Sequence, residues 1–405
     1  MKRIFAWMAC AALCLACWRC SEAEAPLPDP TPEPDPDPCV ELSAGGTANC
    51  YVVTEAGDYR FDATVCGNGA ATEGLEAPAP LAGSSARLLW QTAPEMIPQV
   101  ELTEGEIRFT VADRCGNALI ALCDESGTVL WSWHIWFPEA EIAAIPAKTG
   151  YEVMNLNLGA MTDRVADPAS YGMLYQWGRK DPFPAAATLT GDTSTVGAPI
   201  YDAEGNRVAI TNSSWTSTAD NTLAYAIAHP MVALSNYAQY NTTRDWLEAS
   251  QRNDALWGNP QGLERDSETN TYPHKGAKSF YDPCPVGWRV PPADVFRTFT
   301  TSGGYAWTVA DFDVSGDYRY GWTFCMAGGA TAYFPAAARF DGSYAMLMGS
   351  MSGIWGNYWG NAPGSSNSFQ GGGFVVLSFD GSQMTVSPSG SGGRADAYSV
   401  RCIRE

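Results

Sequence analysis

The chain has 405 residues and carries 44 acidic against 24 basic side chains, which gives a formal net charge of −20 at pH 7. This charge argues against nucleic acid as a partner, because phosphates need cationic side chains. The composition is globular, with 45% hydrophobic and 12% aromatic residues, and the 40 glycines and 15 tryptophans favour short strands and loops over a helical fold.

The N-terminus has the layout of a secretory signal peptide. Two basic residues precede an apolar run over 4–17, which is too short to span a bilayer as a helix. A small residue precedes Cys17, as in a bacterial lipobox, although Cys14 stands where such boxes usually have leucine. We expect residues 1–17 to be a lipoprotein signal peptide, with Cys17 as the lipidated residue and Cys20 as the alternative. An ordinary signal peptide with incidental cysteines is the simpler interpretation.

Residues 18–39 are predicted to form a linker rich in proline and aspartate. The stretch 26–38 alternates proline with acidic and small polar residues, which favours an extended polyproline-II spacer of roughly 40 Å. The segment 21–24 resembles the acidic tract that follows the lipid in surface-exposed Bacteroidetes lipoproteins. Because a lipid anchors a protein without threading it through the membrane, we expect a lipid-anchored protein of the outer membrane that faces the cell exterior.

Residues 40–145 have the pattern of a β-domain. Over 51–65, two short β-rich runs flank a Glu-Ala-Gly-Asp turn, and apolar side chains at 59, 61 and 63 alternate with polar ones at 60, 62 and 64, the period of two that marks a half-buried strand. Residues 117–137 predict a hairpin around an Asp-Glu-Ser-Gly turn, in which alternate side chains from Trp131 to Phe137 point to one face. His134 points to the other face and is interpreted as structural. Short strands with frequent turns predict an all-β, Ig-like sandwich.

A proline-rich corner, Tyr-Asp-Pro-Cys-Pro-Val-Gly-Trp-Arg-Val-Pro-Pro, occupies 281–292. Its prolines fix φ and remove N–H donors, so it can be neither a central strand nor a helix interior. Cys284 therefore has three roles open to it: metal binding, reactivity or pairing with another cysteine. The only histidines, His134, His229 and His274, are far apart in the sequence, so we expect no zinc site and no cofactor.

Six motifs follow one another over the last 260 residues of the chain. They are 154–161 (MNLNLGAM), 171–184 (YGMLYQWGRKDPFP), 281–292, 333–342 (YFPAAARFDG), 356–361 (GNYWGN) and 398–405 (YSVRCIRE). In this order they resemble the Fibrobacter succinogenes major paralogous domain, a family related to the C-type-lectin-like and formylglycine-generating-enzyme-like folds. The resemblance implies an α+β, C-type-lectin-like domain over 146–405 with an insertion at about 185–280. The expected fold class is multidomain, with an N-terminal all-β Ig-like sandwich followed by this domain.

The resemblance also implies a disulfide between Cys284 and Cys402, because lectin-like folds commonly join their terminal elements in this way and an exported protein permits it. Formylglycine-generating enzymes use a reactive cysteine pair, for which only Cys325 and Cys402 are available. Because Cys402 is already expected to pair with Cys284, the resemblance gives that activity little support. The other cysteines of the body cannot be paired from their spacing: Cys39, Cys50, Cys66, Cys115, Cys123 and Cys325.

One acidic turn resembles the first half of a calcium loop. Asp311, Asp313, Ser315 and Asp317 stand at alternate positions around Gly316. The twelfth position is Trp322 and not glutamate, so the bidentate ligand is missing. Calcium is therefore a weak candidate, and an acidic surface turn is the simpler interpretation.

We expect a non-catalytic cell-surface lipoprotein for binding or adhesion, as a fimbria-associated or tip component that recognises a glycan or a surface protein. The expected binding surface is the glycine- and aromatic-rich stretch 351–373. Its predicted ligand contacts are Trp355, Asn357, Tyr358 and Trp359, with Arg339 as a further candidate. Core packing is the alternative for the first four, and a structural salt bridge for Arg339. The rival classes are an exported enzyme acting on glycans or sulfated substrates and a structural subunit that assembles with fimbrial partners.

Overall fold

The computed structural model describes residues 39–405 with several gaps. The gaps are 215, 218, 238–243, 263, 265, 269–271, 304–305, 364–373, 378–382 and 388–391. The predicted signal peptide, nearly all of the linker and both candidate lipidation sites, Cys17 and Cys20, lie outside the described residues, so these expectations stay predictions. Within the described ranges, no helix is both long and apolar enough to cross a bilayer.

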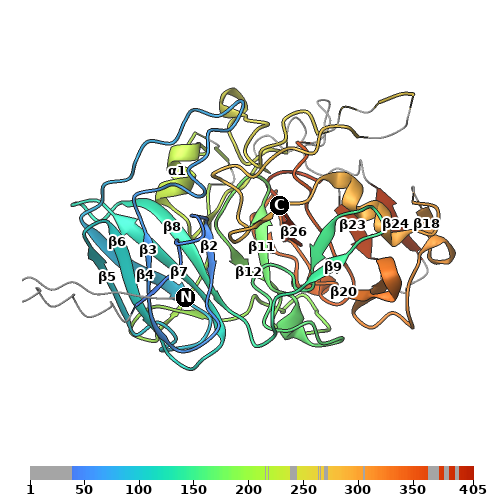
Figure 1. Cartoon of the computed structure of the whole chain (residues 1–405), viewed down its shortest axis with the longest axis horizontal. Helices are drawn as coiled ribbons and strands as arrows, with labels where there is room; N and C mark the ends of the chain where they lie inside the picture. Colours follow the sequence, from blue (N-terminus) through green and yellow to red (C-terminus); the bar gives the residue numbers. More distant parts are fainter. Residues whose placement is uncertain are drawn as a thin grey trace, which may run out of the picture. The chain divides into compact units, whose positions relative to one another are not determined.

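The first part of the folded chain contributes most strands of two sheets that share a core (Figure 1). Their orders are β1-β3-β6-β5 and β14-β13-β4-β7-β8-β2. The strands are β1 Val40–Glu41, β2 Cys50–Val52, β3 Gly57–Asp62, β4 Ser85–Gln91, β5 Gln99–Thr103, β6 Glu106–Val111, β7 Gly116–Cys123, β8 Val129–Phe137, β13 Ile200–Tyr201 and β14 Arg207–Val208. Buried and half-buried residues alternate along β6, because one face of this sheet covers the core.

The hairpin predicted over 117–137 is confirmed, since β7 and β8 pair antiparallel along their length. Both strands are almost entirely buried because their sheet is covered on both faces. On one face, Trp133 packs against Phe61 of β3, with ring centroids 5.1 Å apart. On the other face, Trp136 belongs to a second core that continues into the C-terminal half of the chain.

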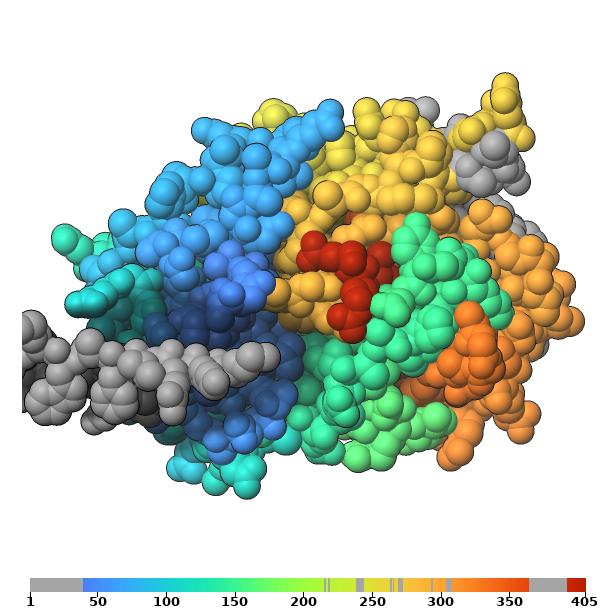
Figure 2. Space-filling view, in the orientation of Figure 1, coloured from blue at the N-terminus to red at the C-terminus, as the bar shows by residue number. Residues whose placement is uncertain are grey.

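The remaining strands form smaller sheets. Their orders are β17-β26-β10-β9, β12-β11-β25-β21-β22, β18-β24-β23, β19-β20 and β15-β16. The strands are β9 Ala144–Pro146, β10 Glu152–Met154, β11 Met173–Gln176, β12 Phe183–Pro184, β15 Thr211–Asn212, β16 Val232–Ala233, β17 Trp288–Arg289, β18 Ala306–Thr308, β19 Gly321–Cys325, β20 Thr331–Pro335, β21 Phe340–Asp341, β22 Met346–Leu347, β23 Phe374–Leu377, β24 Gln383–Ser387, β25 Ala397–Ser399 and β26 Ile403–Arg404. Figure 2 shows the C-terminal residues, in red, between the green and yellow-orange segments that contain β10 and β17, the strands with which β26 pairs.

Helices are few and short. The helical elements of the described residues are α1 Leu223–Ala228 and the 3-10 turns Pro168–Ser170, Ala249–Gln251, Ala293–Phe299, Val309–Asp311, Ala327–Gly329 and Gly349–Met351. The Ala293–Phe299 turn follows directly on the prolines that end the corner at 281–292. Loops and short strands therefore carry most of the C-terminal half.

The expected fold class, an Ig-like sandwich followed by an α+β lectin-like domain, is wrong. The structure is nearly all β, with 31% strand and 9% helix, and its several small sheets have a four-blade propeller-like arrangement. Residues 200–208, placed in the predicted insertion, instead extend the first region's six-stranded sheet, where Tyr201 of β13 pairs with Gln91 of β4. The reason is physical: alternation identifies a strand, but long-range pairing decides which sheet receives it.

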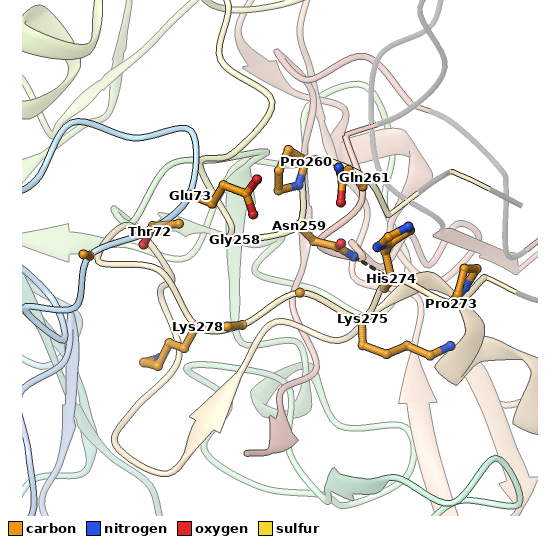
Figure 3. A pocket seen from close by; sticks show the side chains of 13 residues that line it. Thr72, Glu73, Gly258, Asn259, Pro260, Gln261, Pro273, His274, Lys275 and Lys278 are labelled. Atoms are coloured by element: carbon orange, nitrogen blue, oxygen red, sulfur yellow. Dashed lines mark hydrogen bonds between the residues drawn. The ribbon is translucent and has the colours of Figure 1, made fainter.

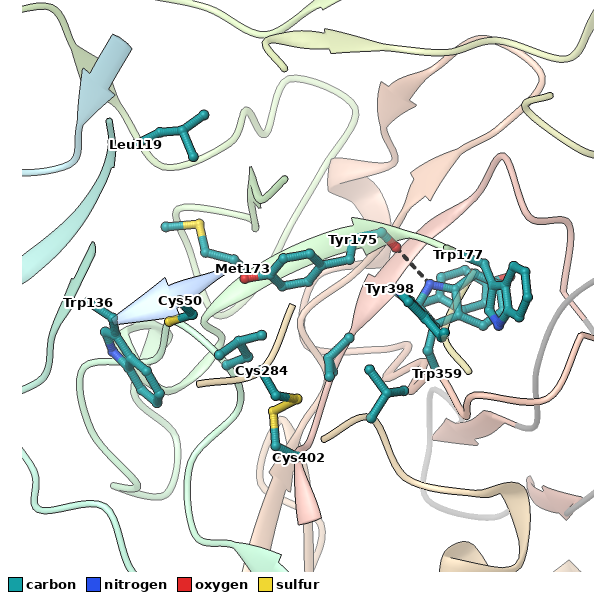
Figure 4. Close-up of a cluster of buried hydrophobic side chains, with 14 of the residues drawn as sticks. Cys50, Leu119, Trp136, Met173, Tyr175, Trp177, Cys284, Trp359, Tyr398 and Cys402 are labelled. Atoms are coloured by element: carbon teal, nitrogen blue, oxygen red, sulfur yellow. Dashed lines mark hydrogen bonds between the residues drawn. A yellow bond between two sulfur atoms is a disulfide. The ribbon is translucent and has the colours of Figure 1, made fainter. Parts of the chain in front are cut away.

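The disulfide between Cys284 and Cys402 is confirmed (Figure 4). Next to it, the buried carboxylate of Asp282 accepts hydrogen bonds from the backbone N–H groups of Cys284 and Val290, both 2.8 Å long. The buried ammonium of Lys278 donates to Asp282, to the Cys284 carbonyl and to the Trp288 carbonyl at 2.7–2.8 Å. All three Lys278 donors are thus satisfied. The disulfide and these hydrogen bonds together hold the proline-rich corner rigidly, and we call this group of contacts the staple.

Candidate functional site

Three of the predicted ligand contacts lie in the core and not on a binding surface. Trp359 is fully buried, donates from Nε1 to the Tyr175 carbonyl oxygen at 2.7 Å and stacks on Tyr398 with centroids 4.1 Å apart (Figure 4). Tyr358 is also fully buried and donates its hydroxyl to the Pro335 carbonyl at 2.7 Å. Asn357 is 1% exposed. The expectation that these side chains contact a ligand is corrected, because they face the protein interior.

Trp355 and Arg339 are half-buried and contact each other. The guanidinium carbon of Arg339 lies 5.0 Å from the centroid of the Trp355 ring, and its Nη2 lies 3.8 Å from a carboxylate oxygen of Asp341. The backbone N–H of Ala338 donates to the Trp355 carbonyl at 3.0 Å. These contacts fasten two neighbouring segments together, which agrees with the structural alternative for Arg339. The rest of the expected surface, 364–373, lies outside the described residues.

The acidic turn has internal partners. Asp313 accepts from Lys148 Nζ at 2.7 Å, and Asp311 accepts from the Thr308 hydroxyl at 2.9 Å. Among the residues that the structure describes, no three His, Cys, Asp or Glu side chains lie together as metal ligands would. Burial and a hydrogen bond to Asp313 raise the pKa of the Cys325 thiol, which disfavours its reactive thiolate. Its expected companion, Cys402, is oxidised in the disulfide.

A polar pocket of about 450 Å³ lies between residues 71–73, 258–261 and 273–278. Figure 3 shows the side chains of Glu73, Gln261 and His274 around it. Its ammonium groups are engaged elsewhere, since Lys275 pairs with Asp294 at 2.6 Å and Lys278 belongs to the staple. The pocket offers mixed hydrogen-bonding groups, and its lining has no phenylalanine, tyrosine or tryptophan ring on which a sugar could stack.

A second hollow, of about 680 Å³, combines aromatic and cationic side chains. Tyr318, Arg319 and Tyr320 line one side, and Thr190, Gly191 and residues 352–354 line the other. We call this hollow the tyrosine cleft. It had escaped sequence reasoning, although the run Tyr-Arg-Tyr-Gly follows Asp317, the last residue of the proposed calcium turn, directly. The sequence signal for this cleft is a pair of tyrosines on either side of an arginine, followed directly by Gly321.

The turn that carries the two tyrosines is fixed from three sides. The Tyr318 hydroxyl donates to the Gly353 carbonyl at 3.0 Å, and the Tyr333 hydroxyl donates to the Arg319 carbonyl at 2.8 Å. The backbone N–H of Ala336 donates to the Tyr320 carbonyl at 2.8 Å. Burial raises the pKa of Tyr318, so its hydroxyl stays protonated and remains a donor. The side chains of the turn are therefore presented on a rigid base.

Tyr320 has a left-handed backbone conformation with φ of +56°. Such a conformation is uncommon for a bulky residue and costs roughly 1–2 kcal/mol. Its ring lies close to Gly353, where a Cβ would come within 2.8 Å of Tyr320 Cδ1 and would collide with the Leu189 carbonyl. Glycine at 353 thus leaves room for both the ring and the neighbouring loop.

The opposite side of the cleft is equally constrained. The Ser352 hydroxyl donates to the Thr188 carbonyl, and the Tyr171 hydroxyl donates to the Leu189 carbonyl at 3.2 Å. A Cβ at Gly191 would collide with the Gly349 carbonyl oxygen, so the two loops are in close backbone contact there. The cleft is therefore preorganised, with partly exposed tyrosine rings and an exposed guanidinium as its chemical groups.

No family model, no curated protein and no solved structure matches the chain. The resemblance to the Fibrobacter succinogenes major paralogous domain therefore stays an expectation, and the function is argued from the residues of the cleft.

Proposed function

We propose that this protein is a non-catalytic binding protein of the cell surface and that it recognises carbohydrate through the tyrosine cleft. The observation that carries the proposal is the strained, left-handed backbone of Tyr320 at the edge of an open cleft. Strain of this kind persists only where the surroundings enforce it, and it concentrates at ligand sites. Here three hydrogen bonds to the turn enforce it.

The chemistry of the cleft suits a sugar. A pyranose ring has one apolar C–H face that packs on an aromatic ring, and its rim carries hydroxyls that need donors and acceptors. Tyr318 and Tyr320 supply rings, Arg319 supplies several N–H donors, and Thr190 supplies an exposed hydroxyl. The volume of about 680 Å³ lies within the roughly 300–1,000 Å³ of small-ligand sites.

Placement at the cell surface completes the proposal and rests on the sequence. The lipobox-like Cys17, with Cys20 as the alternative, would hold the protein in the outer membrane, and the proline-rich stretch 26–38 would act as a spacer. A tethered domain that binds a glycan without catalysing a reaction would serve adhesion, either as a component of a fimbria or as a separate surface protein.

A glycan array tests the proposal directly. The purified full chain, Tyr320→Gly and a control, Tyr344→Ala, are applied to the same array. Tyr344 is a partly exposed tyrosine outside the cleft. We expect saturable binding by the wild type and by Tyr344→Ala, and its loss in Tyr320→Gly. Binding that survives in Tyr320→Gly, or no binding at all, would overturn the proposal.

A second candidate function, a structural assembly subunit, is favoured by one feature. Val196 and Met346, which are 61% and 50% exposed, line an apolar groove of about 900 Å³ beside β14 and β22. Strands β14 and β22 are each at the edge of their sheet. An open edge next to apolar side chains can accept an added strand. If this is the function, Met346→Lys removes the protein from high-molecular-mass assemblies of the producing cells, whereas Tyr320→Gly does not.

A further inference from the structure

We infer that the tyrosine cleft selects anionic sugars, whose rings carry a carboxylate or sulfate group, and that Arg319 determines this specificity. The inference rests on the proposed function, since it names the class of carbohydrate that the same cleft takes. It concerns charge, whereas the proposed function depends on the tyrosine rings.

The charge of the cleft is opposite to that of the chain. Acidic residues outnumber basic ones by 44 to 24 in the sequence. The lining of the cleft nevertheless contains a single charged side chain, that of Arg319, and no carboxylate. A negatively charged ligand meets repulsion over most of an acidic surface, so a local cationic cleft is where it can bind.

The guanidinium of Arg319 is available for a ligand. The side chain is exposed and forms no salt bridge with any described residue. Its backbone is held on both sides, because its N–H donates to the Gly321 carbonyl at 3.0 Å and its carbonyl accepts from the Tyr333 hydroxyl at 2.8 Å. A planar guanidinium on a fixed backbone matches the paired oxygens of a carboxylate or sulfate.

The acidic residues around Arg319 leave this charge largely uncompensated. Asp167 and Arg319 both lie near the Tyr333 hydroxyl. The Asp167 carboxylate is paired with Arg164 at 2.9 Å. Asp317 is exposed and stands two residues before Arg319 in the same turn. Its negative charge would oppose an anion bound in the cleft, so its removal provides a second, independent test.

Tyr318 and Tyr320 distinguish a sugar from other anions. They flank Arg319 in the sequence, and both line the cleft with it. An anionic sugar uses both kinds of contact at once, a ring face on tyrosine and an acidic group on the guanidinium. A neutral sugar uses only the first, and an acidic peptide mainly the second.

The test compares Arg319→Gln, Arg319→Lys and Asp317→Asn with the wild-type full chain on an array of carboxylated, sulfated and neutral glycans, with polyglutamate as an anionic peptide. Arg207→Gln, a change at another exposed arginine that lies outside the cleft, is the matched control. We expect anionic glycans to bind best, with the carboxylated and sulfated members showing which group is preferred. Arg319→Gln should weaken this binding by about tenfold to a hundredfold.

Further expectations follow from charge. Arg319→Lys should retain part of the binding, and Asp317→Asn should bind at least as tightly as the wild type. Raising salt from about 50 to about 500 mM should weaken the binding of anionic glycans more than that of neutral ones. Equal binding of neutral and anionic glycans with no effect of Arg319→Gln overturns the inference while the proposed function stands. Polyglutamate bound as tightly as the glycans also overturns the inference. An array on which no glycan is bound overturns both the inference and the proposed function.

Discussion

The indole Nε1 of Trp359 donates a hydrogen bond to the carbonyl oxygen of Tyr175, 2.7 Å away and fully inside the protein (Figure 4). The Tyr175 ring belongs to the same core as the disulfide between Cys284 and Cys402. The conspicuous aromatic residues near the end of the chain therefore stabilise its interior. The side chains that line the tyrosine cleft, our proposed binding site, lie elsewhere, on the short turn that carries Tyr318 and Tyr320.

Truncation of Trp359 should lower the stability of the fold, because its ring is part of the core. Trp359→Ala leaves a cavity at a fully buried site and removes the hydrogen-bond donor of the Tyr175 carbonyl oxygen. We therefore expect a loss of about 3–5 kcal/mol in the free energy of unfolding. The half-buried Trp355 is the matched control, and Trp355→Ala should cost clearly less. Denaturant titration measures both. Equal costs for the two variants would contradict the burial described here.

Removal of the disulfide should destabilise the fold strongly. The bond closes a loop with a sequence separation of 118 residues, worth roughly 5 kcal/mol in the chain-entropy model. The double variant Cys284→Ala/Cys402→Ala should show this loss in denaturant titration, whereas Cys325→Ser should stay near the wild type. Alkylation of the unfolded, unreduced wild type should leave Cys284 and Cys402 unlabelled, and labelling of either would show that the pair is not formed.

The buried imidazole of His134 should make stability depend on pH. Asn117 donates its amide N–H to the Gly159 carbonyl at 2.9 Å, so its Oδ1 faces His134 and accepts from Nε2 at 2.8 Å. This assigns the neutral tautomer with its proton on Nε2. Burial lowers the pKa of His134 to about 3, whereas an unfolded histidine titrates near 6.5.

Because the unfolded chain takes up this proton first, the contribution of His134 is complete above about pH 6.5 and declines as the pH falls toward 3. Between about pH 7 and pH 4.5 the wild type should lose about 2–3 kcal/mol more than His134→Gln, as followed by urea titration at each pH. His229→Gln, a change at a histidine outside the core, should follow the wild-type profile. Parallel wild-type and His134→Gln profiles would refute the assignment.

Tyr320 should matter little for stability, although we propose it as a ligand contact. Tyr320→Gly removes a partly exposed ring but also relieves the left-handed strain, so the two effects should offset to within about 1 kcal/mol. Gly353→Ala should cost more, because its Cβ collides with the Leu189 carbonyl. Thermal unfolding compares the two. A large loss for Tyr320→Gly would mean that the ring is a core residue.

Local patterns in the sequence predicted local structure well. The alternation over 117–137 predicted both the hairpin and the two faces of β8, since a period of two is a property of the strand itself. The disulfide between Cys284 and Cys402 also agreed with expectation. The global fold differed from the expected one, because sheet membership depends on pairings such as that of Tyr201 with Gln91, which join distant parts of the chain.

The candidate site was missed for a related reason. Tryptophan, tyrosine and asparagine are the residue types of sugar sites and also of packed cores, so Asn357, Tyr358 and Trp359 could not be assigned to either without their neighbours. The tyrosine cleft joins residues near 190, 319 and 353, and no spacing in the sequence brings these segments together. The positive φ of Tyr320 is likewise visible only in the folded chain.

A crystal structure of the full chain with the strongest glycan from the array would show whether carbohydrate binds at the tyrosine cleft. We expect one sugar ring packed against Tyr320, with its polar groups toward Arg319 and residues 352–354. A glycan held elsewhere, such as between Glu73 and His274 in the polar pocket, would mean that the tyrosine cleft is not the carbohydrate site.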